Sequence, residues 1–470
     1  MPTIIGAGDP TSGYEIDNSL RFNDDDSAFL DKTFGSSGNR KTLTISCWIK
    51  RATLSTFQTI ISACPNGSST GDDISFQTSD KILIDIITSN GRYQAQSSGV
   101  FRDVAAWYHV VVKIDTTQAS NRMLLYVNGE LQATNSEGIP QNEDITFLSD
   151  TLHNIGRRSV NNGSPADYYM SDFHFIDGTA LAPTSFAETN DNGVWVPIKY
   201  TGSYGTNGFH LEFQQTGTSA DASGKGADTS GNGNHFDDNN LTATDVTTDT
   251  PTNNFATLNP LIPVQQVPTY SEGNTKVVFK DGGNGCSPLS TFVVNSGKWY
   301  FEAKFVETSV VGRGAIGVGI VDADKYNPYG DADDAFDLES FGYSYTTDGH
   351  AKTNNSTSSF GSTYASGDII SVAVDFDNRQ IYYSKNGTLQ NSGDPTSGAS
   401  GTGSAHNFSV GTYYFAVYGY QNENSWEMNF GNAPFSISSS NSDGNGYGSF
   451  EYAVPSGYYS LCTKNLAEYG

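Results

Sequence analysis

Two stretches of the sequence decide the fold. Residues Trp107–Ala133 have the sequence WYHVVVKIDTTQASNRMLLYVNGELQA, and residues Gly367–Gln390 have the sequence GDIISVAVDFDNRQIYYSKNGTLQ. Each contains an apolar run, an Asp-containing turn, a second apolar run and an Asn-Gly pair. Asn-Gly is typical of tight hairpins, because both turn positions adopt positive φ. The repetition of this pattern in the two halves of the chain predicts two related jelly-roll-type sandwich domains.

The rest of the sequence also favours strands. Short alternating runs such as LTISCWI, KILIDII and WYFEAKF are bounded by Gly, Asn, Asp or Ser, and no window of helical length has a continuous apolar stripe. The chain contains 50 Gly, 27 Phe, 26 Tyr and 5 Trp, while charged residues make up only 16%. This composition argues against both disorder and a helical fold. We therefore predict an all-β protein with two antiparallel β-sandwiches.

The charge restricts the classes of partner. With 25 Lys and Arg against 51 Asp and Glu, the formal net charge is −26. Nucleic-acid binding depends on basic side chains, and anionic membranes attract them, so neither is an expected partner. No apolar stretch is long enough to insert into a membrane, and the N-terminus lacks the pattern of a signal peptide. We expect synthesis in a cytoplasm without a signal peptide; if the protein works outside a cell, it leaves by a route other than ordinary secretion.

Composition also changes along the chain. Four of the sixteen prolines fall within residues 251–268, after a loop rich in Gly, Asp and Asn. Proline lacks an N–H donor, so this region is predicted to be an extended connector. The predicted organisation is an N-terminal arm (1–14), a first sandwich (15–215), a linker (216–272), a second sandwich (273–436) and a C-terminal tail (437–470). The four scattered cysteines are interpreted as buried free thiols.

Several motifs resemble known families. The first half resembles a laminin-G or concanavalin-A-like jelly roll in the segments SLRFNDDDSAFL, SCWIKR, WYHVVV and YVNGEL. The second half resembles a SPRY domain in GKWYFEAKF, IGVGIVDAD, FGYSYTTDGHAK, GDIISVAVDFD and WEMNFG. The joining stretch VWVPIKYTGSYGTNGFHLEF and the tail segment PSGYYSLCTKNL are similar to large structural proteins of marine bacteriophages that pair these two domains.

This resemblance implies a virion protein exposed on the particle, in a tail fibre, spike or surface appendage. Its expected partners are other virion subunits, further copies of itself, and host-cell surface glycan or protein used for attachment. One alternative is a purely structural component, such as a capsid decoration or a tail or neck adaptor. A third interpretation is a polysaccharide-degrading enzyme.

The sequence gives little support to catalysis. Retaining glycosidases need two carboxyl groups about 5–5.5 Å apart. The nearest candidates, Glu302 and the pair Glu423 and Glu427, lie in strand patterns that the SPRY resemblance explains structurally. The seven histidines are dispersed, with no HExxH motif and no nucleophile elbow. We predict that the protein is not an enzyme and requires no cofactor.

The SPRY resemblance places a binding surface on the loops at one sandwich edge. The residues predicted to bind a ligand there are Tyr326, Tyr329, Asp334, Phe336, Tyr345, His350, Asn422 and Trp426. For Trp426 core packing is the stronger interpretation, and for Tyr326 and Tyr329 binding and simple exposure are equally weighted. Asp331, Asp333 and Asp337 could hold calcium, which takes several oxygen ligands. Asn161, Asn162, Tyr168 and Tyr169 are weaker candidates in the first domain.

Overall fold

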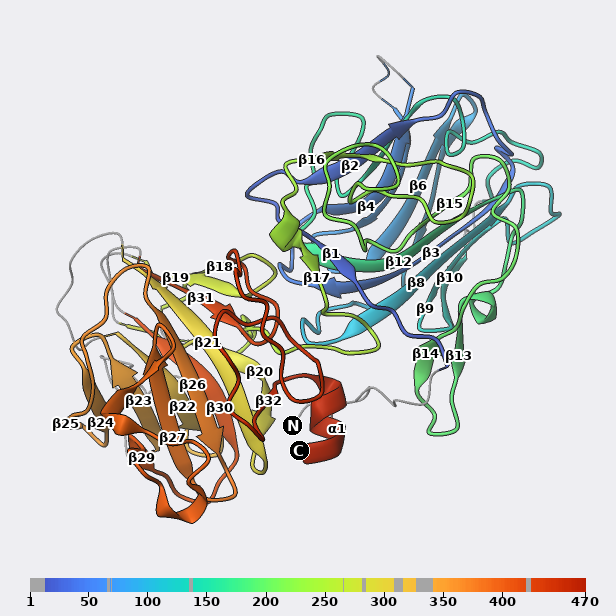
Figure 1. The fold of residues 1–470 in the computed structure, drawn as a ribbon. Helices are drawn as coiled ribbons and strands as arrows, with labels where there is room; N and C mark the ends of the chain where they lie inside the picture. The colour runs from blue at the N-terminus through green and yellow to red at the C-terminus, as the bar shows by residue number, and fades with distance from the viewer. Residues whose placement is uncertain are drawn as a thin grey trace. The chain divides into compact units, whose positions relative to one another are not determined.

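The regular structure is nearly all β, as the sequence predicts. The computed structural model describes residues 13–470 apart from 66–67, 69, 135–137, 265, 281–284, 308–315, 327–340 and 420–423. The chain divides into two compact units between Asn254 and Phe255. Within each unit, antiparallel sheets pack face to face (Figure 1). This confirms the prediction of two β-sandwich domains.

The first unit contains two large sheets and a small hairpin. The first sheet consists, in spatial order, of β10 (Glu130–Thr134), β9 (Met123–Val127), β8 (Trp107–Asp115), β3 (Thr42–Arg51), β12 (Tyr168–Asp177), β1 (Ser19–Phe22) and β17 (Val246–Thr247), and β15 (Phe209–Leu211) also pairs with β12. The second sheet consists of β16 (Asp237–Asn239), β2 (Phe29–Thr33), β11 (Leu152–Ile155), β4 (Gln58–Cys64), β5 (Asp72–Phe76), β6 (Ile82–Thr88) and β7 (Gly91–Gln96). The hairpin consists of β13 (Ala187–Thr189) and β14 (Trp195–Pro197).

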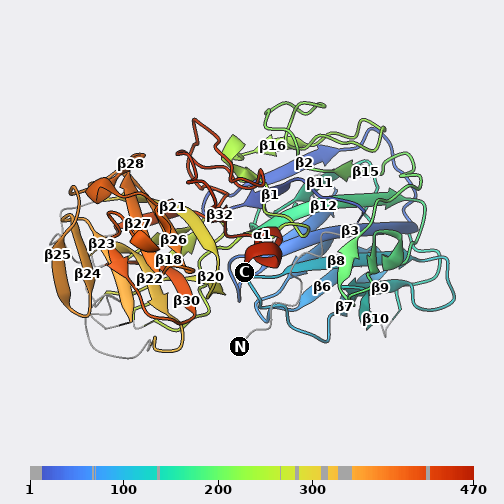
Figure 2. The same cartoon turned by 60° about the horizontal axis from the view of Figure 1, so that its bottom comes forward.

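The second unit has the same two-layer plan (Figure 2). One sheet consists of β18 (Thr269–Ser271), β19 (Lys276–Val278), β31 (Ser425–Asn429), β21 (Lys298–Val306), β26 (Ile369–Asp375), β27 (Gln380–Lys385) and β28 (Thr388–Leu389), joined by β29 (His406–Asn407) and β32 (Tyr459–Ser460). The other consists of β20 (Leu289–Val294), β30 (Tyr413–Tyr418), β22 (Gly317–Asp322), β23 (Gly342–Thr346), β24 (His350–Thr353) and β25 (Ser356–Ser359).

Helical segments are short. The described part of the chain contains one α-helix, α1 (Thr463–Tyr469), and 3₁₀ turns at η1 (Pro183–Ser185), η2 (Ala243–Asp245), η4 (Gln390–Ser392) and η5 (Gly398–Ser400). No helix among the described residues is long and apolar enough to cross a membrane. All four cysteines are free and buried, in agreement with the sequence-based interpretation.

The two predicted Asn-Gly hairpins are present. Asn128 and Gly129 have φ values of 50° and 80° between β9 and β10, and Asn386 and Gly387 have φ values of 48° and 77° between β27 and β28. Positive φ at both positions is the geometry of a type I′ turn, whose twist matches that of the flanking strands. The two stretches that decide the fold therefore form equivalent hairpins in the two units.

Strand β12 is buried on both of its faces. Tyr168, Met170 and Phe173 point into the main core between the two sheets. Tyr169 belongs instead to a second cluster on the outer face of the first sheet, with Ile16, Trp48, Trp107 and Ala187. Trp195 of the β13–β14 hairpin and Tyr14 pack against this cluster. The outer face of the first sheet is therefore covered by other segments of the same unit.

Part of the predicted linker belongs to the two sheets of the first unit. Within residues 216–254, β16 pairs with β2 and β17 pairs with β1. Buried ion pairs reinforce these contacts, Arg21 Nη2 lying 3.2 Å from Asp245 Oδ1 and Lys225 Nζ lying 2.9 Å from Asp238 Oδ2. These residues are thus an integral part of the first unit rather than a free connector, because they extend both sheets and their buried charged groups are paired.

The predicted C-terminal tail (437–470) is similarly part of the second unit. Strand β32 pairs in parallel with β21. Glu302 of β21 is fully buried and accepts hydrogen bonds from the backbone N–H groups of Glu451, at 2.9 Å, and Tyr452, at 2.8 Å. Its carboxylate also accepts from the Tyr300 hydroxyl at 3.0 Å and from Asn429 Nδ2 at 3.1 Å. Burial raises the pKa of Glu302, and these donors oppose that effect.

We predict that Glu302→Gln destabilises the second unit by about 2–4 kcal/mol, because the new NH₂ group cannot accept from the tail and leaves a buried N–H without an acceptor. Denaturant unfolding measures the loss, and hydrogen exchange of residues 298–306 assigns it to this unit. Glu427→Gln is the control. Its half-buried pairs with Lys276 and Lys304 contribute less than about 1 kcal/mol. Equal losses in the two variants would contradict the role given to Glu302.

Candidate functional site

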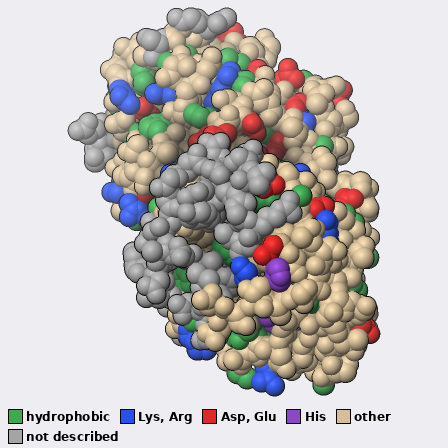
Figure 3. All heavy atoms as spheres, turned by 90° about the vertical axis from the view of Figure 1, so that its left-hand side faces the viewer, with side chains coloured by type: hydrophobic (Ala, Val, Ile, Leu, Met, Phe, Trp, Pro, Cys, Tyr) green, Lys and Arg blue, Asp and Glu red, His purple; other side chains and the backbone are tan. Residues whose placement is uncertain are grey.

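Half of the residues predicted to bind a ligand on the SPRY loops are not among the described ones. Tyr329, Asp334, Phe336 and Asn422 lie outside the described residues, as do the candidate calcium ligands Asp331, Asp333 and Asp337. The binding role and the calcium site therefore remain predictions. On the visible part of one face of the molecule, acidic and basic side chains intermingle rather than forming a patch of one sign (Figure 3).

Two of the predicted binding residues are core residues. Tyr345 and Trp426 are fully buried. The Tyr345 hydroxyl donates a hydrogen bond to the carbonyl of Ser362, and Trp426 Nε1 donates to the carbonyl of Tyr418 at 3.2 Å. Their rings fill the space between the sheets and do not present a face to a ligand. The core interpretation of Trp426 is thus the right one, and the binding role of Tyr345 is corrected.

The remaining sequence candidates differ in exposure. Tyr326 is half-buried and packs on a small hydrophobic cluster of β20, β22 and β30. His350 is half-buried, with Nδ1 3.0 Å from Asp348 Oδ1. In the first unit Asn162 is exposed, whereas Tyr168 and Tyr169 are buried on opposite faces of β12. These two tyrosines are also corrected from binding to packing roles, because both faces of their strand are covered.

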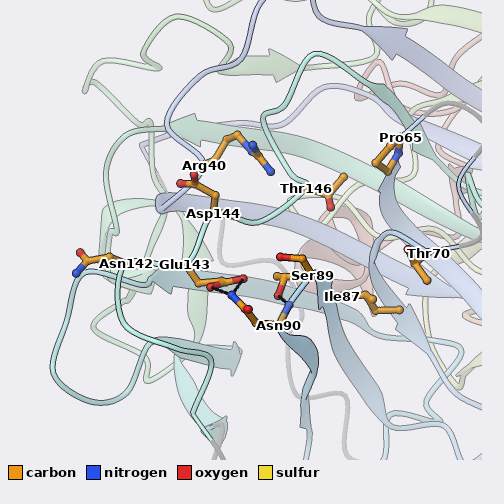
Figure 4. A pocket seen from close by; sticks show the side chains of 11 residues that line it. Arg40, Pro65, Thr70, Ile87, Ser89, Asn90, Asn142, Glu143, Asp144 and Thr146 are labelled. Atoms are coloured by element: carbon orange, nitrogen blue, oxygen red, sulfur yellow. Dashed lines mark hydrogen bonds between the residues drawn. The ribbon is translucent and has the colours of Figure 1, made fainter.

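A polar pocket lies at one end of the first sandwich (Figure 4). Its volume is about 570 Å³, within the range typical of small-ligand sites. It is formed where four connections meet: the approach to β3, the β4–β5 loop, the β6–β7 turn and the loop before β11. The lining residues are Arg40, Pro65, Thr70, Ile87, Thr88, Ser89, Asn90, Asn142, Glu143, Asp144 and Thr146.

Hydrogen bonds already orient the polar groups of the pocket. Asn90 Nδ2 donates to both carboxylate oxygens of Glu143, at 3.1 and 2.9 Å (Figure 4). Arg40 Nε donates to the carbonyl of Ile145 at 2.7 Å, which fixes the guanidinium. Asp144 Oδ1 lies 3.7 Å from Lys41 Nζ, a loose surface pair. The pocket thus presents amide, hydroxyl, carboxylate and guanidinium groups, a mixture suited to hydrogen bonding with a polyhydroxylated ligand.

Asp72 connects two of the segments that line the pocket. It is buried, and its carboxylate accepts from the N–H groups of Ile87 at 3.1 Å, Thr146 at 2.6 Å and Phe147 at 2.9 Å. Burial raises the pKa of Asp72 to about 7, against the opposing effect of these three amides and Arg40. One carboxylate therefore joins the β6–β7 turn to the loop before β11, so the pocket is preorganised.

Sequence reasoning did not identify this pocket. The segments SNG (89–91) and QNEDIT (141–146) are ordinary polar connections in the sequence. They come together only because β5 and β11 begin, and β6 ends, at the same end of the second sheet. An acidic residue at the start of a buried strand, as in DDISF, is the one local signal of a structural carboxylate.

A second polar cluster crosses the outer face of the first sheet. Ser46 Oγ and His109 Nε2 are 2.8 Å apart, a separation typical of a nucleophile and its base. However, Trp195 Nε1 donates to His109 Nδ1 at 3.0 Å, so the proton of the imidazole lies on Nε2 and that atom cannot accept the Ser46 proton. Burial lowers the pKa of His109 to about 3. This pair is therefore a structural contact.

Asp172, His174 and His210 form a buried group of possible metal ligands on the same face. Asp172 occupies a β-bulge with φ 50°, and its carboxylate lies 2.7 Å from His210 Nε2 and 3.1 Å from His174 Nε2. Burial alone would raise the pKa of Asp172, but the two histidines hold it well below its usual range.

The imidazole rings do not converge on a common ion. Those of His174 and His210 are stacked, with centroids 4.1 Å apart and planes inclined by 10°. A bound metal lies close to the plane of each imidazole that coordinates it. Two nearly parallel, stacked planes cannot both contain the same ion. The group thus fits a hydrogen-bonded network better than a metal centre. Tyr204 and Thr229 complete this network, at 2.8 and 3.0 Å from the Nδ1 atoms of His174 and His210.

The depressed pKa of His109 has a measurable consequence. Between pH 6.5 and 3 the unfolded chain takes up a proton at this residue and the folded chain does not, so stability falls as pH falls. His109→Gln removes this contribution. We predict that the destabilisation caused by the variant, measured by denaturant unfolding, is about 2 kcal/mol smaller at pH 5 than at pH 7. An unchanged difference at the two pH values would show that His109 titrates normally in the fold.

Comparison with known proteins agrees with the two-domain organisation. Residues 23–185 match the family model of the concanavalin A-like lectin/glucanases superfamily, and residues 298–433 match that of the SPRY domain. The chain therefore contains a concanavalin A-like domain followed by a SPRY domain, as the sequence motifs indicate. A search of curated proteins finds no match.

The comparison with solved structures finds SPRY domains and a pentraxin among its matches. The SPRY domain of human HERC1 is 18% identical, with a TM-score of 0.29, over 36% of this chain and 96% of that one. A human SPRY domain is 22% identical, with a TM-score of 0.24, over 33% of this chain and 90% of that one. The heptameric SAP-like pentraxin from Limulus polyphemus is 16% identical, with a TM-score of 0.29, over 36% of this chain and 80% of that one.

Proposed function

We propose that this chain is a non-enzymatic binding protein of a bacteriophage virion, part of a tail fibre, spike or surface appendage that attaches to host-cell glycan or protein. Concanavalin A-like and SPRY domains are both classes associated with binding or protein interaction. The resemblance of the joining stretch and the tail to marine phage structural proteins supports the virion assignment. Other virion subunits and further copies of the chain are the proposed assembly partners.

The observation that carries the binding role is the preorganised pocket of the first unit. Its polar groups are held in place by Asp72 and by the bonds of Arg40 and Asn90. Side chains fixed before binding lose little entropy when a ligand arrives. The described lining residues include no aromatic ring, so hydrogen bonds to sugar hydroxyls would supply most of the recognition. A single site of this kind is weak, and several copies on one particle would bind by avidity.

We expect Asn90→Ala and Glu143→Ala each to weaken glycan binding by about 10-fold or more, since a hydrogen bond to a charged group contributes about 1.5–3 kcal/mol. A glycan array with the purified chain identifies a ligand, and calorimetry of the variants measures the loss. Asn407→Ala, an exposed substitution in the second unit, is the matched control and should bind normally. Undiminished binding by both pocket variants would exclude this pocket as the site.

The SPRY loops provide the competing site, and one variant separates the two. We expect Tyr326→Ala to leave glycan binding unchanged within about twofold if the pocket is the site. Loss of binding in Tyr326→Ala with normal binding in the pocket variants would move the site to the second unit. Failure of the chain to bind any glycan or host surface protein, together with its detection in the particle by mass spectrometry, would favour the purely structural virion role.

A further inference from the structure

Lys50 is a buried lysine in contact with both an amide and a carboxylate. Its Nζ atom lies 2.7 Å from Oδ1 of Asn254 and 2.8 Å from Oδ2 of Asp249. The exposed fractions of Lys50, Asp249 and Asn254 are 1%, 1% and 8%. Lys50 lies near the end of β3, whereas the other two residues lie in the segment that covers the outer face of the first sheet. The contact thus joins two parts of the first unit about 200 residues apart in the chain.

Aromatic side chains surround this contact. Trp107 and Tyr169 are the direct cross-strand neighbours of Lys50, on β8 and β12 respectively. Both rings are buried, and the ammonium lies 5.7 Å from the centroid of the Tyr169 ring. Trp107 Nε1 also lies 3.3 Å from Asp249 Oδ1 and donates to it. Bulk water is therefore excluded from the three polar groups, which strengthens their interactions with one another.

The geometry resembles that of a reactant complex for amide exchange. A hydrogen-bond distance of 2.7 Å to Oδ1 places Nζ about 3.0–3.9 Å from the Cγ carbon of Asn254, depending on the angle at the oxygen. Reacting atoms in near-attack arrangements lie about 3–3.5 Å apart. Asn254 Nδ2 donates to the carbonyl of Ala105 at 2.6 Å, which fixes the orientation of the amide. The fold thus brings together a nucleophile, the Lys50 amine, an acyl carbon, Cγ of Asn254, and a group that can carry protons, the Asp249 carboxylate.

We propose that Lys50 and Asn254 form an intramolecular isopeptide bond, with Asp249 as the proton carrier. The Lys50 ammonium first transfers one proton to the Asp249 carboxylate. The amine lone pair then attacks Cγ of Asn254, and the electron pair of the C=O bond moves to Oδ1. When the C=O bond reforms, the Cγ–Nδ2 bond breaks, and a second proton from Nζ passes through Asp249 to the leaving nitrogen. Ammonia departs, Asp249 retains one proton, and no oxidant, reductant or cofactor is consumed.

The second buried lysine of the first unit provides a natural comparison. Lys225 Nζ contacts the Asp238 carboxylate at 2.9 Å and the carbonyl of Gly217 at 3.2 Å. A carboxylate is a poor acyl donor, and a backbone amide has no ammonia to release. Lys225 is therefore equally buried and equally paired, but its hydrogen-bond partners among the described residues are a carboxylate and a backbone carbonyl rather than a side-chain amide. Substitution of Lys225 is the matched control for substitution of Lys50.

The test is the mass of the intact wild-type chain under denaturing conditions, after prolonged incubation of the folded protein. The expected mass is lower than the sequence mass by one ammonia molecule, and proteolysis should yield a branched peptide that contains both Lys50 and Asn254. The deficit should disappear in Lys50→Arg, Asn254→Ala and Asp249→Asn, and it should persist in Lys225→Arg. Circular dichroism of each variant checks that it folds, and the wild-type measurement decides the question if one does not.

Two results would overturn the proposal. In the first, the wild-type chain has the full sequence mass and the two residues are recovered in separate, unmodified peptides. In the second, ammonia is lost but the deficit persists in Lys50→Arg. That outcome would assign the loss to a cyclised asparagine elsewhere, for example at Asn128–Gly129.

Discussion

Burial of both faces of strand β12 is the constraint on which the first unit depends. A two-layer sandwich ordinarily leaves the outer faces of its sheets in contact with water. Here the outer face of β12 and its neighbours carries Trp48, Trp107 and Tyr169, which need their own apolar cover. The hairpin β13–β14 and the segment up to Asn254 supply it. Asp249, in the segment before Asn254, contacts Lys50 and Trp107 on this face. The residues just before it, which look like a connector, extend the two sheets by pairing beside β1 and β2.

The same cover buries the polar groups on the outer face of the first sheet. Beneath it His109 is neutral, and Ser46 and Trp195 satisfy its two nitrogen atoms. In the Asp172 group, His210 is hydrogen-bonded to Asp172 and His174 is hydrogen-bonded to Tyr204. Both arrangements are buried beneath this cover, and the polar atoms in them serve as one another's hydrogen-bond partners. The polar groups of the pocket, by contrast, are carried on connecting loops at one end of the first sandwich.

The sequence was sufficient to predict the two sandwiches and both Asn-Gly hairpins, since these depend on local alternation and on φ at two positions. The prediction that Trp426 packs in the core is confirmed, because a Trp at the start of a strand such as WEMNF usually points into the sandwich. The pocket was not predictable, because Asn90 and Glu143 meet only through the register of non-adjacent strands. Lys50 and Asn254 were missed for the same reason. Tyr345 was misassigned because an aromatic residue in a Gly- and Ser-rich strand has the same local pattern whether it points inward or outward.

The position of Asn254 bears on how the first unit would resist mechanical load. It is the last residue of that unit, and its side chain contacts an interior strand of the first sheet rather than an edge strand. A pull applied to the chain beyond this residue is transmitted through Lys50 to β3, whose flanking strands β8 and β12 share the load. Many backbone hydrogen bonds must then break together in shear, instead of one at a time by peeling.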